Sequence, residues 1–512
     1  MASIVKSLGI EGVEGYLVDV EIKTIFGQPM VSIVGLGDMA IKEAKERIVA
    51  AINDGGYTFP EMKIVINLAP SDMKKGGSHF DLPMALGILL ETGQLKIRRR
   101  ESYAYIGELS LNAKIRSCNG ILPMVIAAKK AGIKNVIVPR TNIKEALLVG
   151  EMNIFGFDCI QEMAAFLEGK SEYEPPKKIE VQSSPSPHTV DFKDVRGQDA
   201  LIAYIVVAAA GGHNLLMLGA PGCGKSMIAK RIPTILPGMT EGEALEVTKI
   251  YSVAGMLSGN NGLIQQRPFR APHHNASTNA LIGGGNNATP GEISLAHNGV
   301  LFLDEIAEFT KRTLDSLRQP MEDGVVTISR VRYTNSYPAS FMLVAAMNPC
   351  PCGHYGSSKC KCSDYEILKY RQRISGPLLD RMDIQKYVQP VRFQELSNQA
   401  EEGNRSEDLR ERVEKARDIQ KKRFNGIDSI NCNAQMTGNL IKEHCQLDKP
   451  GQDLLQKAHD RYEYSARSYH KYLKIARTFA DLDGAKTIRE TDVAKALMAR
   501  DLEQENMGLM VL

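Results

Sequence analysis

The chain of 512 residues carries a formal net charge of +3, with 43% hydrophobic and 24% charged residues. This composition is that of a globular protein with room for about three domains, and it excludes a chain that attracts nucleic acid through a positive field spread over its whole surface. Any basic surface is therefore local. The first residues show no basic region followed by an apolar core, so we expect no secretory signal and a cytoplasmic protein with reduced thiols.

The first predicted unit spans residues 1–170. Apolar segments such as KIVINLA at 63–69 and NVIVP at 135–139 alternate with helical patterns, which predicts an α/β or α+β domain. Residues 171–190 mix proline, serine and charged residues with little apolar periodicity. That pattern is typical of a linker.

The second predicted unit spans residues 191–390 and contains four apolar segments separated by helical stretches. These segments are NLLMLGA, GVLFLDEI, SFMLVAAMN and MDIQKYV. The alternation predicts a parallel sheet covered by helices. The first segment belongs to an apolar stretch at 201–220 that is about long enough to cross a bilayer. Because GGHN at 211–214 interrupts it, we expect a short buried helix, a turn and a buried strand.

The third predicted unit, residues 391–512, lacks strand patterns. Leu409, Val413 and Ala416 recur there at helical spacing among charged residues. An apolar stripe of this kind predicts amphipathic helices. We therefore expect an all-helical C-terminal part in a chain whose overall fold class is α/β.

A phosphate-binding loop is predicted at residues 219–226. GAPGCGKS fits the pattern G-x-x-x-x-G-K-S between an apolar strand and a helical stretch, and its backbone N–H groups can surround phosphate oxygens. Lys225 would meet the β- and γ-phosphates, and Ser226 would ligate Mg²⁺. The alternative is a glycine-rich turn without a ligand. The predicted nucleotide-binding residues of the loop are Gly219, Ala220, Pro221, Gly222, Cys223, Gly224, Lys225 and Ser226.

An acidic pair, Asp304 and Glu305, ends the second apolar segment. At the carboxyl end of a central strand, Asp304 would bind Mg²⁺ together with Ser226, and Glu305 would polarise a water molecule. A strand can also end in solvated carboxylates. Together with the upstream loop, the pair predicts hydrolysis of a nucleoside triphosphate.

Two further polar residues follow neighbouring strands. Asn348 ends SFMLVAAMN, where its side-chain amide can orient the attacking water. Arg381 stands just before the last strand and could stabilise charge on the γ-phosphate of an adjacent subunit. The alternative for Arg381 is a surface salt bridge with Asp380 or Asp383.

In this order the motifs resemble those of the magnesium-chelatase-like AAA+ ATPases of the ComM/YifB family, over nearly the whole chain. The matching segments are GAPGCGKS, RPFRAPHH, GEISLAHNGVLFLDEI, MNPCPCG and LLDRMDI. The resemblance implies an AAA+ core at 191–390, a helical lid at 391–512, and a nucleotide-dependent ring, usually a hexamer. It also implies that Asn348 is sensor 1, Arg381 the arginine finger and Arg467 the lid's sensor 2, with ATP and Mg²⁺ as cofactors.

The N-terminal unit is similar to the proteolytic domain of Lon proteases, chiefly through residues 107–139. Ser78 falls at or close to the position of their nucleophile, which needs a desolvated lysine to take its proton. An ungapped comparison places Leu122 where Lon has that lysine, and Lys129 and Lys130 do not match. We therefore expect a Lon-like α+β fold without proteolytic activity.

Two basic segments are candidate DNA contacts. Arg267 and Arg270 lie in RPFRAPHH, and Arg330 and Arg332 lie in GVVTISRVRY, which alternates like a hairpin strand. Arginines suit sequence-independent contacts with phosphates. A structural turn and a solvated hairpin face are the respective alternatives.

The resemblance implies a DNA motor that acts on single-stranded or branched DNA, through branch migration during recombination of incoming DNA. The alternative is a protein-remodelling ATPase like the magnesium-chelatase motor subunit. A third hypothesis, an ATP-dependent protease, is disfavoured by Leu122. DNA-stimulated ATP hydrolysis distinguishes the first two.

Four of the nine cysteines fall within NPCPCGHYGSSKCKC at 348–362. Reduced thiols in the cytoplasm disfavour a disulfide knot. Cys350, Cys352, Cys360 and Cys362 could close a tetrahedral Zn²⁺ site, with His354 as a substitute ligand, although the paired cysteines are closer in sequence than is usual for zinc. The alternative is a reduced loop packed on the face of the ring.

Overall fold

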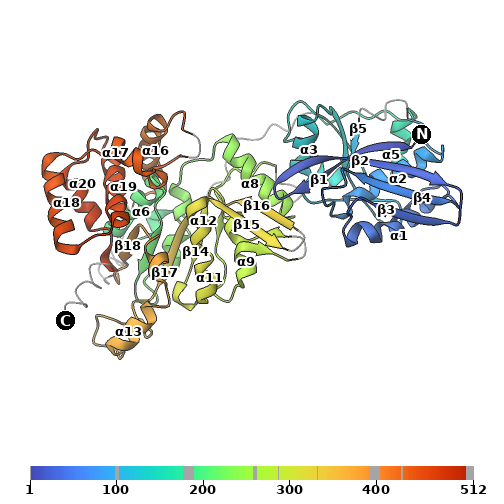
Figure 1. The fold of residues 1–512 in the computed structure, drawn as a ribbon. Helices are drawn as coiled ribbons and strands as arrows, with labels where there is room; N and C mark the ends of the chain where they lie inside the picture. Colours follow the sequence, from blue (N-terminus) through green and yellow to red (C-terminus); the bar gives the residue numbers. More distant parts are fainter. Residues whose placement is uncertain are drawn as a thin grey trace.

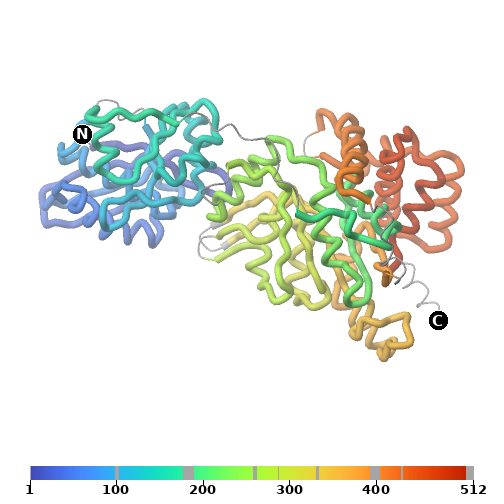
Figure 2. The backbone as a smooth tube through the Cα atoms, turned by 180° about the vertical axis from the view of Figure 1, so that it is seen from behind, coloured from blue at the N-terminus to red at the C-terminus, as the bar shows by residue number. Residues whose placement is uncertain are grey.

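The computed structural model describes residues 2–97, 103–176, 189–257, 262–285, 288–330, 333–391, 404–427 and 430–502. Figures 1 and 2 show three parts in a row: an N-terminal sheet with its helices, a central sheet, and a C-terminal group of helices. Most of the predicted linker lies outside the described residues. Within the described ranges, no helix combines the length and the apolar character needed to cross a membrane.

The N-terminal part contains a seven-stranded mixed sheet in the order β3-β4-β2-β1-β5-β8-β9. The pairs β1–β2 and β2–β4 are antiparallel, and the other pairs are parallel. The strands are β1 (Ser3–Glu11), β2 (Glu14–Ile25), β3 (Met30–Val34), β4 (Lys63–Ala69), β5 (Tyr103–Tyr105), β8 (Asn135–Pro139) and β9 (Asn153–Phe157). Both apolar segments quoted for this unit are strands, β4 and β8.

Apolar residues at every second position of the strands give the sheet an apolar face, and helices pack on this face. Along β4, Ile64, Ile66 and Leu68 are buried and share a core with α1 and α2, as expected from the two-residue period of a strand. The helices are α1 (Met39–Asp54), α2 (Asp81–Glu91), α3 (Ile121–Lys130), α4 (Ile143–Ala146) and α5 (Ile160–Leu167). The short elements are η1 (Ser78–Phe80), β6 (Glu108–Leu109), β7 (Ile115–Arg116) and η3 (Arg140–Asn142).

The central part is a five-stranded sheet in the order β11-β14-β17-β10-β18, parallel throughout. The strands are β11 (Phe269–Arg270), β14 (Val300–Leu303), β17 (Met342–Met347), β10 (Leu215–Leu218) and β18 (Ile384–Tyr387). The four predicted strands and their parallel arrangement are confirmed. The edge strand β11 was not predicted, because two residues inside RPFRAPHH are too few to show a period.

Helices cover both faces of the central sheet. Leu215 and Met217 of β10 join one core cluster, whereas Leu216 and Leu218 join the other. Strands buried on both faces appear as continuous apolar runs, which is what the sequence shows. The helices are α6 (Asp199–Gly211), α7 (Lys225–Ala229), α8 (Glu241–Val253), α9 (Thr278–Ile282), α10 (Glu292–Leu295), α11 (Lys311–Asp315), α12 (Arg318–Asp323), α13 (Asp364–Arg371) and α14 (Gly376–Leu379), with η4 (Phe192–Asp194), η5 (Ile232–Ile235) and η6 (Ile306–Glu308).

The apolar stretch at 201–220 is a helix, a turn and a strand, as predicted. Helix α6 ends at Gly211 and is capped by Gly212, which adopts a left-handed φ of 70° suited to glycine. The chain then enters β10. The stretch is therefore part of the core of the central sheet.

The named elements of the C-terminal part, within its described residues, are all helices, and an isolated β-bridge joins Leu447 to Ile488. Leu409, Val413 and Ala416 are buried along the first of these helices, which confirms their predicted role, and helices α16 and α19 pack against α6. The elements are α16 (Ser406–Arg423), η7 (Asn433–Gln435), α17 (Gly438–His444), α18 (Lys449–Tyr462), α19 (Ala466–Leu482) and α20 (Glu490–Leu497).

A hairpin of β15 (Val325–Arg330) and β16 (Tyr333–Pro338) extends from the central part towards the N-terminal part (Figure 1). The predicted hairpin strand is thus confirmed. Two small ladders, β12 (Gly283–Gly284) with β13 (Thr289–Pro290) and β6 with β7, complete the sheets. The two parts also meet at α8, where Lys249 Nζ lies 3.0 Å from Glu14 Oε1 and the Ser252 hydroxyl donates to Glu145.

Candidate functional site

The phosphate loop connects β10 to α7. Gly222 and Gly224 have φ angles of 80° and 90°, in the left-handed region that favours glycine. Lys225 begins α7, and its Nζ donates to the carbonyl oxygens of Gly219 at 2.6 Å and Ala220 at 3.0 Å. The loop therefore folds around this ammonium group, which is the geometry a phosphate-cradling lysine requires.

A hydroxyl and a carboxylate meet beside the loop. Ser226 Oγ donates to Asp304 Oδ2 at 2.6 Å, and the backbone N–H of Glu305 donates to Asp304 Oδ1 at 3.0 Å. Hydroxyl and carboxylate oxygens are the ligands that Mg²⁺ prefers. The structure brings together the two residues predicted to hold the metal, although they are 78 positions apart.

Asn348 reaches the same loop from the end of β17. Its Oδ1 accepts a hydrogen bond from Lys225 Nζ at 3.2 Å. Because β14 and β17 are neighbours in a parallel sheet, Asn348 and the acidic pair lie on the same edge. A side-chain amide at this place can contact both the terminal phosphate and a water molecule beside it.

Glu305 sits in a strained backbone conformation next to a histidine. Its φ is 48°, uncommon for a residue other than glycine, and its side chain is 53% exposed. Strain of this kind often accompanies function. His274 Nδ1 lies 3.5 Å from Glu305 Oε2. Sequence reasoning placed His274 in a DNA-binding segment and missed this neighbour, since only the pairing of β11 with β14 brings the two together.

Arg381 and Arg467 lie apart from the phosphate loop and close to each other. Both guanidinium groups pair with Oε1 of Glu322, and for Arg467 the distance is 2.7 Å. These pairings lower the pKa of Glu322. The three residues line a cavity of about 1210 Å³ whose described lining includes no residue of 219–226. The partners proposed for Arg381 from sequence, Asp380 and Asp383, are therefore not the carboxylate it contacts.

Lys471 lines the same cavity one helical turn beyond Arg467. It is 8% exposed, and within the described chain its Nζ has no hydrogen-bond partner. Burial, together with repulsion from Arg500, lowers the pKa of Lys471 to about 8. The described lining of the cavity carries six lysine or arginine residues and six aspartate or glutamate residues, so the cations there lie among carboxylates.

The first two candidate DNA-binding arginines are engaged within the chain. Arg270 forms a two-pronged ion pair with Glu292, with both N···O distances at 2.7 Å. Arg267 contacts Glu243 at 3.2 Å and donates to the Asn298 carbonyl at 2.7 Å. This geometry favours the structural alternative for RPFRAPHH.

The hairpin arginines are placed only in part. Arg330 is the last residue of β15 and pairs through its backbone with Tyr333, while Arg332 lies outside the described residues. The hairpin backbone lies against the N-terminal part, where the Ser336 carbonyl would be 3.0 Å from a Cβ added to Gly12.

Ser78 lies in a second cavity, of about 840 Å³, between the N-terminal part and β16. Its hydroxyl donates to Glu108. Leu122 is fully buried in an apolar cluster, while Lys129 and Lys130 pair with Glu151 and Glu14. Among the residues named from sequence, none supplies an amine to Ser78.

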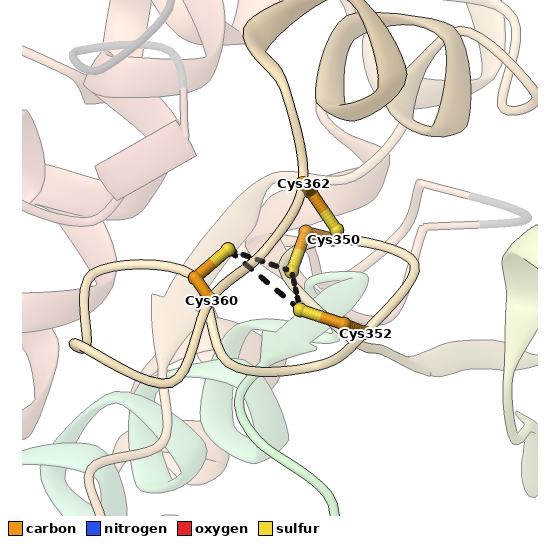
Figure 3. A group of neighbouring side chains, drawn as sticks. All are labelled: Cys350, Cys352, Cys360 and Cys362. Carbon is orange, nitrogen blue, oxygen red and sulfur yellow. Dashed lines mark hydrogen bonds between the residues drawn. The ribbon is translucent and has the colours of Figure 1, made fainter.

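The four cysteine sulfurs meet in one cluster (Figure 3). All lie within 4.8 Å of one another, and Cys350 Sγ is 3.4 Å from Cys352 Sγ and 3.9 Å from Cys360 Sγ. Hydrogen bonds with the backbone of His354 and Lys361 lower the pKa of Cys352 to about 6, which favours the thiolate that metals bind.

Comparison with known proteins covers nearly the whole chain. Residues 191–396 match the family model "Magnesium chelatase, subunit ChlI", residues 20–142 "Subunit ChlI of Mg-chelatase", and residues 403–500 "Magnesium chelatase, subunit ChlI C-terminal". The competence protein ComM of Haemophilus influenzae is 40% identical over 499 residues, which are 97% of this chain and 96% of that protein.

Two other relatives are informative. The uncharacterized protein YifB of Escherichia coli is 40% identical over 502 residues, 98% of this chain and 97% of that protein. The Lon protease of Trichlorobacter lovleyi is 27% identical over 150 residues, 28% of this chain and 18% of that protein. This short match agrees with the similarity to Lon expected from the sequence.

Proposed function

The chain belongs to the ComM/YifB family of magnesium-chelatase-like AAA+ ATPases, and on this premise we propose that it is a ring-forming motor that uses ATP hydrolysis to move along DNA. One relative is a competence protein. We therefore assign the motor to branch migration of the joint DNA molecules that form when incoming DNA recombines. Its place of action is the cytoplasm.

The observation that carries the ATPase part of this proposal is the set of side-chain contacts around the phosphate loop. Lys225 contacts Asn348 and Ser226 contacts Asp304, so residues from three neighbouring strand ends converge where a triphosphate would lie. Ser226 and Asp304 would hold Mg²⁺, which neutralises phosphate charge when bound. Glu305 then activates the attacking water, and Asn348 orients it.

We propose that Arg381 and Arg467 serve the nucleotide of an adjacent copy in a hexamer. Support comes from their shared partner, Glu322, and from the cavity they line, to which the phosphate loop of their own chain contributes none of its described residues. An arginine brought to the γ-phosphate stabilises the charge of the transition state. The ring would thus complete each site.

We assign the working parts to residues 1–170, 191–390 and 391–512, joined after the first by the linker at 171–190. The first part is a Lon-like domain without protease activity, because the buried Leu122 occupies the position expected for the lysine. The second is the ATPase core, and the third is the helical lid. The Lon-like part would act as a collar on the ring.

We assign the DNA contacts to Arg330 and Arg332. Contacts between arginines and phosphates do not depend on base sequence, as translocation requires. Arg267 and Arg270 already pair with carboxylates and would have to leave them before they could contact DNA. We therefore assign them a structural role.

The test is the ATPase rate with single-stranded, duplex and branched DNA over a range of salt concentrations. We expect stimulation by DNA, strongest with branched DNA, and affinity that falls steeply with salt. Replacing Arg330 and Arg332 with alanine should uncouple ATPase activity from strand movement. A matched control removes two exposed lysines from α16, Lys421 and Lys422. If no form of DNA changes the ATPase rate of the assembled ring, the DNA motor is refuted and the alternative, protein remodelling, takes its place.

We further propose that the cysteine cluster holds one Zn²⁺. Four thiolates at about 2.3 Å from a tetrahedral zinc lie about 3.8 Å from one another. The sulfurs of Cys350, Cys352 and Cys360 are 3.4 to 3.9 Å apart, which supports this ligand set. Elemental analysis of protein purified without chelator tests it, and a folded protein free of zinc would refute it.

A further inference from the structure

The cysteine-rich loop at residues 348–362 is continuous with the nucleotide site. It starts at Asn348, which accepts the hydrogen bond from Lys225. Cys350 follows two positions later and is fully buried. The loop is followed directly by Ser363, which caps α13 through reciprocal hydrogen bonds with Glu366. The sulfur cluster is therefore only one residue removed from a side chain that contacts the phosphate-binding lysine.

A second contact joins the loop to the phosphate loop through space. Gly353 has a φ of 78°, and a Cβ added to it would lie 2.5 Å from Cδ and 2.8 Å from Cγ of Pro221. Real Cβ atoms do not approach that closely. The backbone of Gly353 thus packs directly on the proline ring in the middle of GAPGCGKS. Since Gly353 follows Cys352, a bond that holds Cys352 also restricts where Gly353 can lie beside Pro221.

Helix α13 holds the outer side of the loop. Arg371 is 5% exposed, its Nε donates to the Pro349 carbonyl at 3.4 Å, and its guanidinium lies 5.0 Å from the centre of the Tyr355 ring. These contacts hold Pro349 and Tyr355, both in the first half of the loop. They leave the stretch from Gly356 to Cys362, which consists of Gly, Ser, Lys and Cys, without apolar side chains to bury.

Such a loop lacks the apolar area that would hold it in one conformation. A structural metal supplies folding free energy that a short polar loop cannot provide. Removing the metal would release Cys350 and Cys352 together. Asn348 and Gly353 would then lose the restraint that keeps them against Lys225 and Pro221.

We propose that the four-cysteine metal site braces the phosphate loop, so that metal occupancy controls the rate of ATP hydrolysis. This proposal rests on the proposed ATPase activity and zinc site. It adds a role that neither of them contains. The metal would act on the nucleotide site in two ways: through the short backbone connection from Cys350 to Asn348, and through the contact of Gly353 with Pro221.

The test compares two glycines of the same loop in the full-length protein. Gly353 and Gly356 have nearly the same φ, 78° and 81°, but a Cβ at Gly356 meets nothing within 4 Å. Gly353→Ala therefore adds a clash with Pro221 to the backbone strain that both substitutions share. We expect Gly353→Ala to lower kcat by about tenfold or more, because misplacing a positioning group by about 1 Å can cost about a hundredfold.

Zinc content, circular dichroism and binding of a fluorescent ATP analogue are measured on both variants. Gly356→Ala should keep zinc, fold and turnover near those of the parent protein. If Gly353→Ala keeps its zinc and hydrolyses ATP at the parent rate, the brace is refuted. A parent protein that binds zinc but hydrolyses no ATP under any condition would instead refute the proposed function.

Metal removal provides a second, independent measurement. The parent protein is dialysed against a chelator and returned to buffer with Mg²⁺, and ATP turnover is measured before and after Zn²⁺ is restored. We expect a reversible loss of about tenfold or more, with helical content unchanged. Full turnover by a folded, zinc-free protein would overturn the proposal. This measurement decides the question if Gly353→Ala itself loses zinc.

Discussion

The phosphate loop and the face that carries Arg381 differ in the partners that their charged side chains find within one chain. At the loop, Lys225 contacts Asn348 and Ser226 contacts Asp304. Each of these side chains therefore lies beside another residue proposed to act in ATP hydrolysis. At the other face, Arg381 shares Glu322 with Arg467. The proposed function would have a phosphate of the adjacent copy take the place of this carboxylate during catalysis.

This difference supports the proposal that one half of the site, the local half, is built within each copy and that the other half comes from a neighbouring copy. Parallel strands bring their carboxyl ends to one edge of the sheet, so the loop and the acidic pair meet in every copy. The arginines line the cavity between the core and the C-terminal helices, where a neighbouring copy could place its nucleotide. The following substitutions test this division, from the largest expected effect to the smallest.

Arg381→Ala should leave nucleotide affinity unchanged and lower kcat by about 10³-fold or more, the effect typical of an arginine finger. Mixing this variant with Lys225→Ala tests the division directly. At equal amounts, about a quarter of the interfaces in a ring join an intact phosphate loop to an intact arginine. Those interfaces should recover activity. Co-assembled mixtures that stay inactive would place Arg381 outside its neighbour's site.

Glu305→Gln should keep ATP binding and slow hydrolysis by about 10²- to 10⁴-fold, the range for a general base. The amide preserves the shape of the side chain but cannot accept a proton. Single-turnover measurement separates the chemical step from product release. Normal turnover would show that another carboxylate activates the water, and Glu308, three residues on and paired with Arg373, would be the next to test.

Lys225→Ala should weaken ATP binding by about 10- to 100-fold, since it removes charge-assisted hydrogen bonds to the phosphates. The affinity of a fluorescent nucleotide measures this loss. Cys159→Ser, in the N-terminal part, serves as a control that should bind nucleotide normally.

The local half of the site could be predicted from the sequence, because its information is local. GAPGCGKS is eight consecutive residues, and Asp304 and Asn348 each follow an apolar strand whose place in a parallel sheet is itself predictable. The contact of Gly353 with Pro221 could not be predicted, since it depends on a bend within a loop that has no periodicity.

Arg381 and Arg467 were both named from the sequence, but the carboxylate that they share, Glu322, was not, for a related reason. Glu322 is 59 residues from Arg381 and 145 from Arg467, and no spacing connects them. His274 belongs to the segment RPFRAPHH, and Glu305 was itself predicted from the sequence. Their proximity was not predicted, because it depends on the pairing of the two-residue strand β11 with β14. Long-range pairs of charged side chains leave no pattern in the sequence of one chain.

The smallest effect should come from Glu322→Gln. To reach a neighbour's phosphate, Arg381 and Arg467 must leave Glu322, whose side chain is 48% exposed. Ion pairs exposed to this degree contribute about 0.2 to 1 kcal/mol each. Removing the carboxylate charge lowers the free energy needed for the arginines to leave residue 322, so we expect kcat to rise by about two- to fivefold. Glu162→Gln removes a comparably exposed partner of Arg140 in the N-terminal part and should leave kcat unchanged. A fall in kcat for Glu322→Gln, but not for Glu162→Gln, would mean that the Glu322 carboxylate positions the arginines for catalysis. Both halves of the site would then be held in their working arrangement by contacts within one chain.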